Sequence, residues 1–449
     1  MPPKASGESA QGSTIAVLGL GFVGLPLGAT FAELGFSVTG IDVSPRILSQ
    51  LENRKAPFEE AGLQELLHTV LGKNLSVASA MAPKAHNVYI VAVGTPIDDV
   101  TGEPKMEYVQ NAAAMIGAAL KKGDLVIMRS TVPVGTTREV VLPILERESG
   151  LKTGADFDLV FAPERLVAGK ALAELRELPQ IIGGFVGTGD IERAGTLFRS
   201  MTPNIVIAEN LEAAELGKLI DNTYRDLHFA YANQMAMLAE KIGVDLTRLV
   251  HDVNNGYKRN RIPVPSPGVG GICLKKDPGL LIATGKKYGY HPSLTETARL
   301  LNAKMPEHVA ARIIELLRKA GKSSKGAHIF ILGFAFKGKP VTSDTRDAPT
   351  AGVVQALQKE GCSISGYDPV VSKEHFQSLS VAPLSIEEGF KMADAVVIMT
   401  NHPEFETLPI DALLASMKKP ACFFDGWHLF DPEKMRKIEG IVYAGVGNN

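Results

Sequence analysis

The sequence predicts an α/β protein built from two doubly wound parallel-sheet domains, joined by a helical central domain with a long dimerisation helix. Three observations support this prediction. Short apolar runs alternate with helical patterns in the first two hundred residues, a long helical pattern follows without a strong breaker, and a second alternating pattern begins after Ala303. Alternation of strands and helices is typical of a parallel sheet covered by helices.

In the first domain, the run 14–18 ends in a glycine-rich turn, and a helical stretch then leads to a second run at 37–42. Further apolar runs at 87–93, 125–128 and 159–161 alternate with helical patterns. Residues 210–243 read as one helix of roughly 50 Å, at 1.5 Å per residue. The last domain has strand candidates at 327–332, 363–368 and 395–399. We therefore expect a disordered tail at 1–12 and domains at 13–205, 206–304 and 305–449.

Composition excludes several classes of protein. The net charge of −2 gives no electrostatic case for a nucleic acid or acidic-membrane partner. Three cysteines without CxxC spacing favour a reducing cytoplasm and predict neither a disulfide framework nor a metal site. The polar N-terminus does not resemble a signal peptide, and no apolar run is long enough to predict a membrane span.

The first turn, Gly19-Leu-Gly21-Phe-Val-Gly24, predicts a Rossmann-like dinucleotide site. Its glycines permit a tight turn, close approach of a pyrophosphate, and packing of helix on strand. Asp42 ends the next strand, where a carboxylate binds a ribose 2′-hydroxyl and repels a 2′-phosphate, so NAD is favoured over NADP. Arg46 complicates that preference slightly and is assigned to flank the adenosine. The alternative is that the glycines serve packing alone.

On the long helix, Glu215, Lys218 and Asn222 are spaced i, i+3, i+7 and share one face. One interpretation is a solvated polar stripe with an ion pair. The other is an anion cradle, in which the ammonium of Lys218 and the amide of Asn222 stabilise an alkoxide or a tetrahedral oxyanion.

Cys273 lies in the glycine-rich segment Pro265-Ser-Pro-Gly-Val-Gly-Gly-Ile-Cys-Leu-Lys-Lys-Asp277. A thiol at a helix N-terminus near Lys275 and Lys276 is expected to have a lowered pKa and to capture a carbonyl as a nucleophile. Asp277, four residues on, shares its helical face and is a candidate for activating water. Cys362 and Cys422 are interpreted as inert buried cysteines.

These residues resemble the UDP-glucose/GDP-mannose dehydrogenase family of NAD-dependent nucleotide-sugar 6-dehydrogenases over nearly the whole chain after the tail. The resemblance also rests on motifs in the same order along the chain: Val93-Gly-Thr-Pro96, Ser130-Thr-Val-Pro-Val-Gly-Thr136, Ala162-Pro-Glu-Arg165, Ala214-Glu-Leu-Gly-Lys-Leu-Ile-Asp-Asn222 and Gly333-Phe-Ala-Phe-Lys337.

The resemblance implies a four-electron oxidation of a sugar C6 hydroxymethyl to a carboxylate with two NAD in sequence. An aldehyde is captured by Cys273 as a thiohemiacetal, oxidised to a thioester and hydrolysed. The implied catalytic residues are Cys273, Lys218, Asn222, Asp277, Glu164 and Thr131. The implied NAD contacts are Gly19, Gly21, Phe22, Val23, Gly24, Asp42, Arg46, Thr95, Thr131 and Arg346.

The implied substrate contacts are Glu164, Arg165, Leu166, Lys218, Asn222, Arg259, Gly270, Gly271, Phe336 and Lys337. Arg259 matches an arginine that reaches across a dimer interface, with Arg261 as the alternative. Lys337 and Arg346 have the alternative of being ordinary loop charges. A homodimer or higher homo-oligomer is expected, without metal.

Departures from the family pattern bear on the substrate. Ala168 stands where UDP-glucose enzymes commonly have a second glutamate, and Pro163-Glu-Arg165 is more similar to the branch acting on UDP-N-acetylhexosamines. Ile272 stands where that branch often has histidine, which puts any role of that histidine in doubt here. UDP-N-acetylmannosamine or UDP-N-acetylglucosamine is therefore the leading substrate and UDP-glucose the alternative, with the epimer, base, pathway and higher assembly left open. More remote alternatives are a two-electron hydroxyacid dehydrogenase and a non-catalytic NAD or nucleotide-sugar sensor.

Overall fold

The structure is a computed structural model that describes residues 12–98, 100–185 and 189–448. The predicted tail, residues 1–12, therefore lies outside the described residues except for Gly12. The chain forms two compact units: residues 1–221 with 279–291, and residues 222–278 with 292–449. These units divide the stretch 206–304 differently from the expected central domain, so the three-domain division remains a prediction.

The first unit contains a six-stranded parallel sheet of order β3-β2-β1-β4-β5-β6 and a two-stranded parallel sheet of β7 and β8. Its strands are β1 (Thr14–Leu18), β2 (Ser37–Ile41), β3 (Leu75–Ala78), β4 (Val88–Val91), β5 (Asp124–Met128), β6 (Phe157–Phe161), β7 (Gln180–Ile182) and β8 (Ile205–Ile207). Its helices are α1 (Gly24–Glu33), α2 (Pro45–Glu52), α3 (Leu63–Val70), α4 (Glu107–Ala119), the π-helix η1 (Thr137–Val141), α5 (Leu142–Ser149), α6 (Ala171–Glu177) and α7 (Asp190–Arg199).

The second unit contains another six-stranded parallel sheet, of order β11-β10-β9-β12-β13-β14. Its strands are β9 (His328–Leu332), β10 (Ser363–Tyr367), β11 (Ala382–Pro383), β12 (Ala395–Ile398), β13 (Ala421–Asp425) and β14 (Ile441–Gly445). Its helices are α9 (Leu246–Asn254), α11 (Ser293–Lys319), α12 (Pro349–Lys359), α13 (Lys373–Ser378), α14 (Ile386–Met392), α15 (Pro403–Glu406), α16 (Ile410–Ala415) and α17 (Pro432–Met435). The helices α8 (Leu211–Ile242) and α10 (Ile272–Lys287) each contribute residues to both units.

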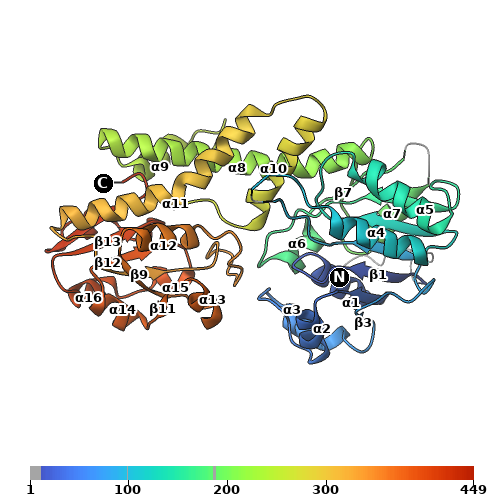
Figure 1. The fold of residues 1–449 in the computed structure, drawn as a ribbon, viewed down its shortest axis with the longest axis horizontal. Coiled ribbons are helices and arrows are strands. Elements are labelled where there is room, and N and C mark those ends of the chain that lie inside the picture. The colour runs from blue at the N-terminus through green and yellow to red at the C-terminus, as the bar shows by residue number, and fades with distance from the viewer. Residues whose placement is uncertain (1–11, 99, 186–188, 449) are drawn as a thin grey trace. The chain divides into compact units, whose positions relative to one another are not determined.

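Each sheet is covered by helices on both faces (Figure 1). In β1, Ile15 and Val17 belong to one buried apolar cluster, whereas Ala16 and Leu18 belong to another. Successive side chains of a strand point to opposite faces, so a strand buried on both faces is apolar throughout. This is why short apolar runs predicted the strands, and the predicted α/β fold with two Rossmann-like sheets is confirmed. The predicted strands are present with ends within two residues of the expected ones.

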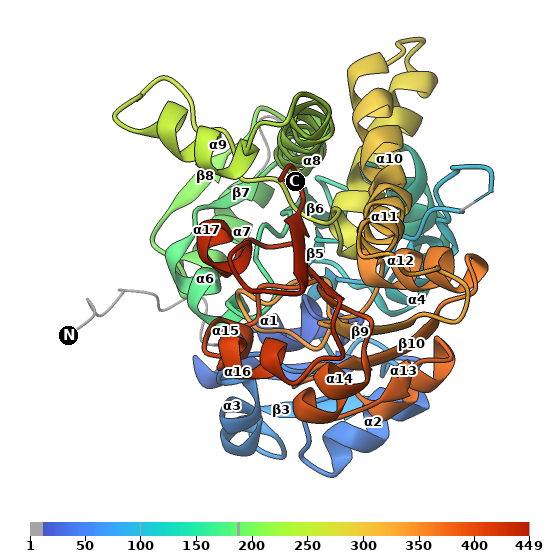
Figure 2. The same ribbon diagram turned by 90° about the vertical axis from the view of Figure 1, so that its left-hand side faces the viewer.

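The C-terminal segment packs onto α8 and α9 within the second unit (Figure 2). Gly447 N donates to Glu240 Oε1 at 2.8 Å, and its carbonyl accepts from Leu246 N at 2.9 Å. Glycine is favoured there because the residue has φ +70°, and a Cβ atom would also lie 3.0 Å from that of Ala236. This end of the chain therefore stabilises the second half of α8.

The two sheets repeat one local arrangement after their first strands. Asp42, after β2, accepts from Leu20 N at 2.7 Å, and Asp368, after β10, accepts from Phe334 N at 2.7 Å. In both places the carboxylate therefore fixes the loop that follows the central strand.

Candidate active site

The glycine loop after β1 has one face that is open to a ligand. Gly19 has φ +92°, and a Cβ atom there would lie 2.7 Å from Ala92 O. A Cβ atom at Gly24 would lie 1.9 Å from Gly19 O, so α1 can begin against the turn only with glycine at this position. At Gly21, by contrast, a Cβ atom would meet nothing within 4 Å. The loop therefore has open space at Gly21, and binding of a pyrophosphate there remains a prediction.

Asp42 is fixed by two backbone groups. Its Oδ2 accepts from Leu20 N at 2.7 Å, and its Oδ1 accepts from Ser44 N at 2.8 Å. Each carboxylate oxygen has further acceptor capacity, and the residue is partly exposed, so a ribose hydroxyl can still bind. Arg46 is exposed on α2, and Phe22 stacks on Phe58 with ring centroids 4.1 Å apart.

Thr95 and Thr131 meet at the carboxyl ends of the neighbouring strands β4 and β5. Thr95 is buried, and its Oγ1 donates to Thr131 O at 2.5 Å. In an open α/β sheet this edge is where ligands bind. The contact brings together two of the predicted NAD-site residues.

Glu164 and Lys218 form a buried pair in the first unit. Glu164 follows β6, Lys218 lies on α8, and Lys218 Nζ is 4.0 Å from Glu164 Oε2. Their exposed fractions are only 8% and 4%. Glu164 Oε1 also accepts from Leu166 N, whereas Arg165 Nη1 donates to Asp221 Oδ2 at 3.3 Å. A buried ammonium beside a carboxylate can stabilise an oxyanion and hold a proton near it.

The third residue of the predicted face, Glu215, has another role. It is fully buried, and it accepts hydrogen bonds from Gly135 N at 2.6 Å and from Thr137 N at 2.9 Å. Burial raises the pKa of Glu215 to about 7, against the opposing effect of hydrogen bonds from Thr137 and Gly135. The alternative of a solvated polar stripe is wrong because Glu215, Lys218 and Asn222 are all buried. The carboxylate instead fixes the loop after Thr131.

Cys273 lies in the first turn of α10 in the second unit, and it is exposed. One helical turn later, Asp277 is buried, and its Oδ2 accepts from Asn222 Nδ2 at 2.5 Å. Lys276 Nζ lies 2.8 Å from the other carboxylate oxygen. Lys275 instead pairs with Asp347 at 2.8 Å. The predicted carboxylate and amide are therefore in contact, and the predicted thiol lies one helical turn before the carboxylate.

Gly270, Gly271, Phe336 and Lys337 also come together in the second unit. A Cβ atom at Gly271 would lie 2.9 Å from the Phe336 ring, and Lys337 Nζ lies 5.3 Å from the centroid of that ring. Arg346 binds Asp344 through two hydrogen bonds, of 2.9 Å and 2.7 Å. That ion pair raises the pKa of Arg346, and Cys273 is near enough to add to the effect. The roles of these residues remain predictions.

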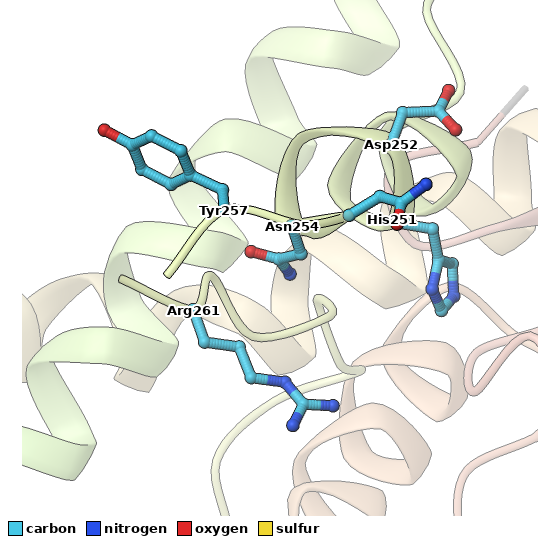
Figure 3. A pocket seen from close by; sticks show the side chains of 6 residues that line it. His251, Asp252, Asn254, Tyr257 and Arg261 are labelled. Carbon is cyan, nitrogen blue, oxygen red and sulfur yellow. The ribbon is translucent and has the colours of Figure 1, made fainter. Parts of the chain in front are cut away.

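The loop between α9 and the segment 265–277, which carries Cys273, contains Arg259 and Arg261. Asn254 closes it by donating to Ile262 O at 2.8 Å and accepting from Ile262 N at 2.9 Å. A surface pocket of about 490 Å³ lies beside the loop, and Arg261 lines it together with Tyr257 (Figure 3). Arg259 is exposed and is not among the lining residues, so the choice between the two arginines stays open.

Sequence reasoning missed several buried polar residues near the predicted site. Arg129 is 2% exposed, and it donates to Ala162 O at 3.1 Å and to Gln180 Oε1 at 2.8 Å. Burial lowers the pKa of Arg129 to about 10, an effect that the nearby Glu164 carboxylate opposes. The sequence gives one indication that Arg129 lies near the site, because it directly precedes the motif that begins with Ser130 and Thr131.

No group of three or more metal-binding side chains occurs among the described residues. In the same part of the chain, no helix is both long and apolar enough to cross a membrane.

Comparison with known proteins gives consistent results along the chain. The models of the UDP-glucose/GDP-mannose dehydrogenase family match residues 13–202 (NAD binding domain), 212–304 (central domain) and 330–432 (UDP binding domain). The UDP-N-acetyl-D-mannosamine dehydrogenase of Pyrococcus horikoshii is 34% identical over 96% of this chain and 99% of its own. The UDP-glucose 6-dehydrogenase TuaD of Bacillus subtilis is 30% identical over 96% of this chain and 93% of its own. A solved structure of the UDP-D-ManNAc dehydrogenase from Pyrococcus horikoshii matches with a TM-score of 0.87 and 34% identity, covering 97% of this chain and 99% of that one.

Proposed function

The chain belongs to the UDP-glucose/GDP-mannose dehydrogenase family of NAD-dependent enzymes, and we propose that it oxidises C6 of a UDP-N-acetylhexosamine to the uronic acid. UDP-N-acetylmannosamine is the first candidate because the 34% identical relative carries that name. UDP-glucose is the alternative, favoured by the 30% identity to TuaD. The product would supply sugar acids for polysaccharide or glycan synthesis.

One observation carries the four-electron chemistry: an exposed thiol and a buried carboxylate lie one turn apart on α10. Oxidation of an alcohol to an aldehyde needs no thiol, whereas oxidation of an aldehyde to an acid is helped by covalent capture. Cys273 and Asp277 are therefore assigned to the second half of the reaction.

When bound at the glycine loop, NAD accepts a hydride in each of the two oxidations. Glu164 takes up the C6 hydroxyl proton, and the ammonium of Lys218 beside it stabilises the alkoxide. Cys273 Sγ then adds to the aldehyde carbon to form a thiohemiacetal, whose oxidation gives a thioester. Water held by Asp277 attacks the thioester carbon, and the C–S bond breaks. One alcohol, two NAD⁺ and one water thus give one carboxylate, two NADH and three protons.

Asn222 has a double role in this scheme. One of its amide hydrogens bonds Asp277 at 2.5 Å, which leaves the second for the oxyanion on the sulfur-bound carbon. The residues proposed to bind NAD lie in the glycine loop, after β2 and in three later loops: Gly19, Gly21, Phe22, Val23, Gly24, Asp42, Arg46, Thr95, Thr131 and Arg346. The residues proposed to bind the sugar nucleotide are Glu164, Arg165, Leu166, Lys218, Asn222, Arg259, Gly270, Gly271, Phe336 and Lys337.

We also propose a homodimer, formed through the part of α8 between Tyr224 and Ile242. Tyr224, Tyr231, Leu238 and Ile242 lie at helical spacing and are 60%, 51%, 52% and 65% exposed. A large exposed apolar stripe is typical of an association surface, and an identical stripe on a second copy is the simplest partner. A reducing cytoplasm is the proposed location, because it keeps the Cys273 thiol available.

The test is a panel of UDP-N-acetylmannosamine, UDP-N-acetylglucosamine and UDP-glucose, scored by NADH released per mole of sugar and by product mass. Two NADH and a uronic acid from an N-acetylated sugar are expected. One NADH per sugar would indicate a two-electron dehydrogenase, and none with any sugar would indicate a sensor. Two NADH from UDP-glucose alone would transfer the assignment to the alternative substrate.

A further inference from the structure

The helix that carries the thiol contains a proline beyond its first turn. Pro278 is the seventh residue of α10, which runs from Ile272 to Lys287. In an α-helix the N–H of residue 278 would donate to the carbonyl of residue 274, and proline has no N–H. The ring of a proline also pushes that carbonyl outward. The Leu274 carbonyl, next to Cys273, therefore needs a donor from elsewhere.

Arg299 on α11 supplies that donor. Its Nη1 donates to Leu274 O at 2.8 Å and also bonds Asp226 Oδ1 on α8. The side chain of Arg299 is 15% exposed and that of Asp226 only 1%. A hydrogen bond from a charged donor is roughly twice as strong as a neutral one. The guanidinium thus replaces the hydrogen bond that Pro278 removes, and Asp226 fixes its direction.

A second set of hydrogen bonds anchors the beginning of the segment 265–277, which carries Cys273. Asn302 Nδ2 donates to Asp226 Oδ1 at 2.9 Å, and its Oδ1 accepts from Asn233 Nδ2 at 3.5 Å. Asn233 Oδ1 in turn accepts from Ser266 N at 3.0 Å. Asp226, Asn233, Ser266 and Asn302 are all buried. One polar network therefore anchors the chain on both sides of Cys273, at residues 266 and 274.

We propose that Arg299 is a positioning residue for Cys273, acting as the substitute for the helix hydrogen bond that Pro278 deletes. The link to catalysis rests on the proposed function, because it takes Cys273 as the nucleophile. Without Arg299 the first turn of α10 loosens. The backbone N–H groups that stabilise a thiolate at a helix N-terminus then lose their alignment.

The competing explanation is that Arg299 only neutralises Asp226. A variant that removes Arg299 alone would leave a buried charge without its counterion, and that would destabilise the protein for a trivial reason. The test therefore starts from an Asp226→Asn variant, which has no charge at residue 226. Its asparagine Oδ1 can still accept a hydrogen bond from Arg299. Arg299→Met is added to this background, and then Pro278→Ala, which restores an N–H to bond Leu274 O.

Two measurements are made on the full-length protein. The first is the alkylation rate of Cys273 by iodoacetamide between pH 6 and 9, followed by mass spectrometry, with the buried Cys362 and Cys422 as internal references. The second is kcat and KM for the sugar and for NAD. Arg299→Met is expected to slow alkylation and lower kcat by about tenfold, with little change in KM for NAD. The pH midpoint of alkylation should move upward. Adding Pro278→Ala should recover most of both losses.

The proposal is overturned if Arg299→Met changes neither quantity, or if Pro278→Ala recovers nothing while the melting temperature stays at the background value. Alkylation needs no sugar, so this test is independent of turnover. An absence of NADH from every UDP-sugar with the wild-type protein would defeat the proposed function instead, and would leave the alkylation result to decide on Arg299.

Discussion

Asp277 Oδ2 accepts a hydrogen bond of 2.5 Å from Asn222 Nδ2, and both side chains are buried. The carboxylate is thus held by an amide on one side and by Lys276 on the other. A carboxylate fixed in this way can hold and activate the water that attacks the thioester. Asp277→Asn should keep the shape of the site but remove this base. We expect kcat to fall about a hundredfold. A sugar adduct on Cys273 should accumulate and be detected by intact-protein mass spectrometry, and wild-type turnover without an adduct would contradict the assignment.

Cys273→Ser should abolish production of the uronic acid, because a serine hydroxyl is a far weaker nucleophile than a thiolate at neutral pH. NAD binding, measured by calorimetry, should stay within about twofold of the wild type, since the thiol is assigned to the sugar and not to the cofactor. Cys362→Ser is the matched control, and it should leave acid production intact. Full acid production by Cys273→Ser would refute covalent capture.

Asp42→Ala should weaken NAD binding by about tenfold, since it removes a charged acceptor proposed for the ribose hydroxyl. It also removes the contact to Leu20 N, so Asp42→Asn, which keeps one acceptor, separates the two effects. Preference for NAD over NADP should decline in both variants because the repulsive charge is gone. Dissociation constants from calorimetry test this, and an unchanged value for Asp42→Ala would exclude the ribose role.

Glu215 should make stability depend on pH. Burial raises the pKa of Glu215 to about 7 from the ordinary glutamate value of 4.5, so the folded protein holds this proton more tightly than the unfolded chain. The associated stability is fully present below pH 4.5 and is lost as pH rises through 7. The stability of the wild type relative to Glu215→Gln should therefore fall between pH 5 and pH 8 in urea unfolding. Glu209→Gln, at an exposed position beside α8, is the control. A constant difference would show that Glu215 stays ionised.

Leu238→Glu should shift the proposed dimer toward monomer, because it places a charge in the exposed apolar stripe of α8. Leu238 is 52% exposed in the single chain. Sedimentation velocity at micromolar concentration measures the effect, with Tyr290→Glu as a control at a 70% exposed aromatic outside α8. A wild-type protein that is a strict monomer at this concentration would remove the dimer claim.

Much of the fold and several site residues could be predicted because their signals are local. The run that forms β1, the glycines after it and Asp42 lie within thirty residues of one another, and each has a chemical reason visible in the sequence. The same is true of Cys273 and Asp277, which share one helical face.

The remaining contacts depend on tertiary structure. Glu215 binds backbone groups some eighty residues earlier, at Gly135 and Thr137, where no local pattern indicates a partner. Arg299 reaches Leu274 from another helix. The N–H that Pro278 lacks follows from the sequence, but the residue that replaces its hydrogen bond does not. The long helix α11 also runs across the expected boundary at 304/305 and lies within the second unit from end to end.

The arrangement shared by Asp42 and Asp368 extends to their neighbours. Gly19 and Gly333 both have positive φ, and Leu20 and Phe334 pack against Gly40 and Gly366, respectively, on the second strand of each sheet. The same combination of a carboxylate, a glycine and an apolar side chain therefore shapes the loop after the first strand of both sheets. The two loops differ at the next position, where the first has Gly21 beside open space and the second has the buried Ala335. The methyl group of Ala335 takes the place of the open space at Gly21, so the backbone of the first loop is the more accessible of the two to a phosphate group.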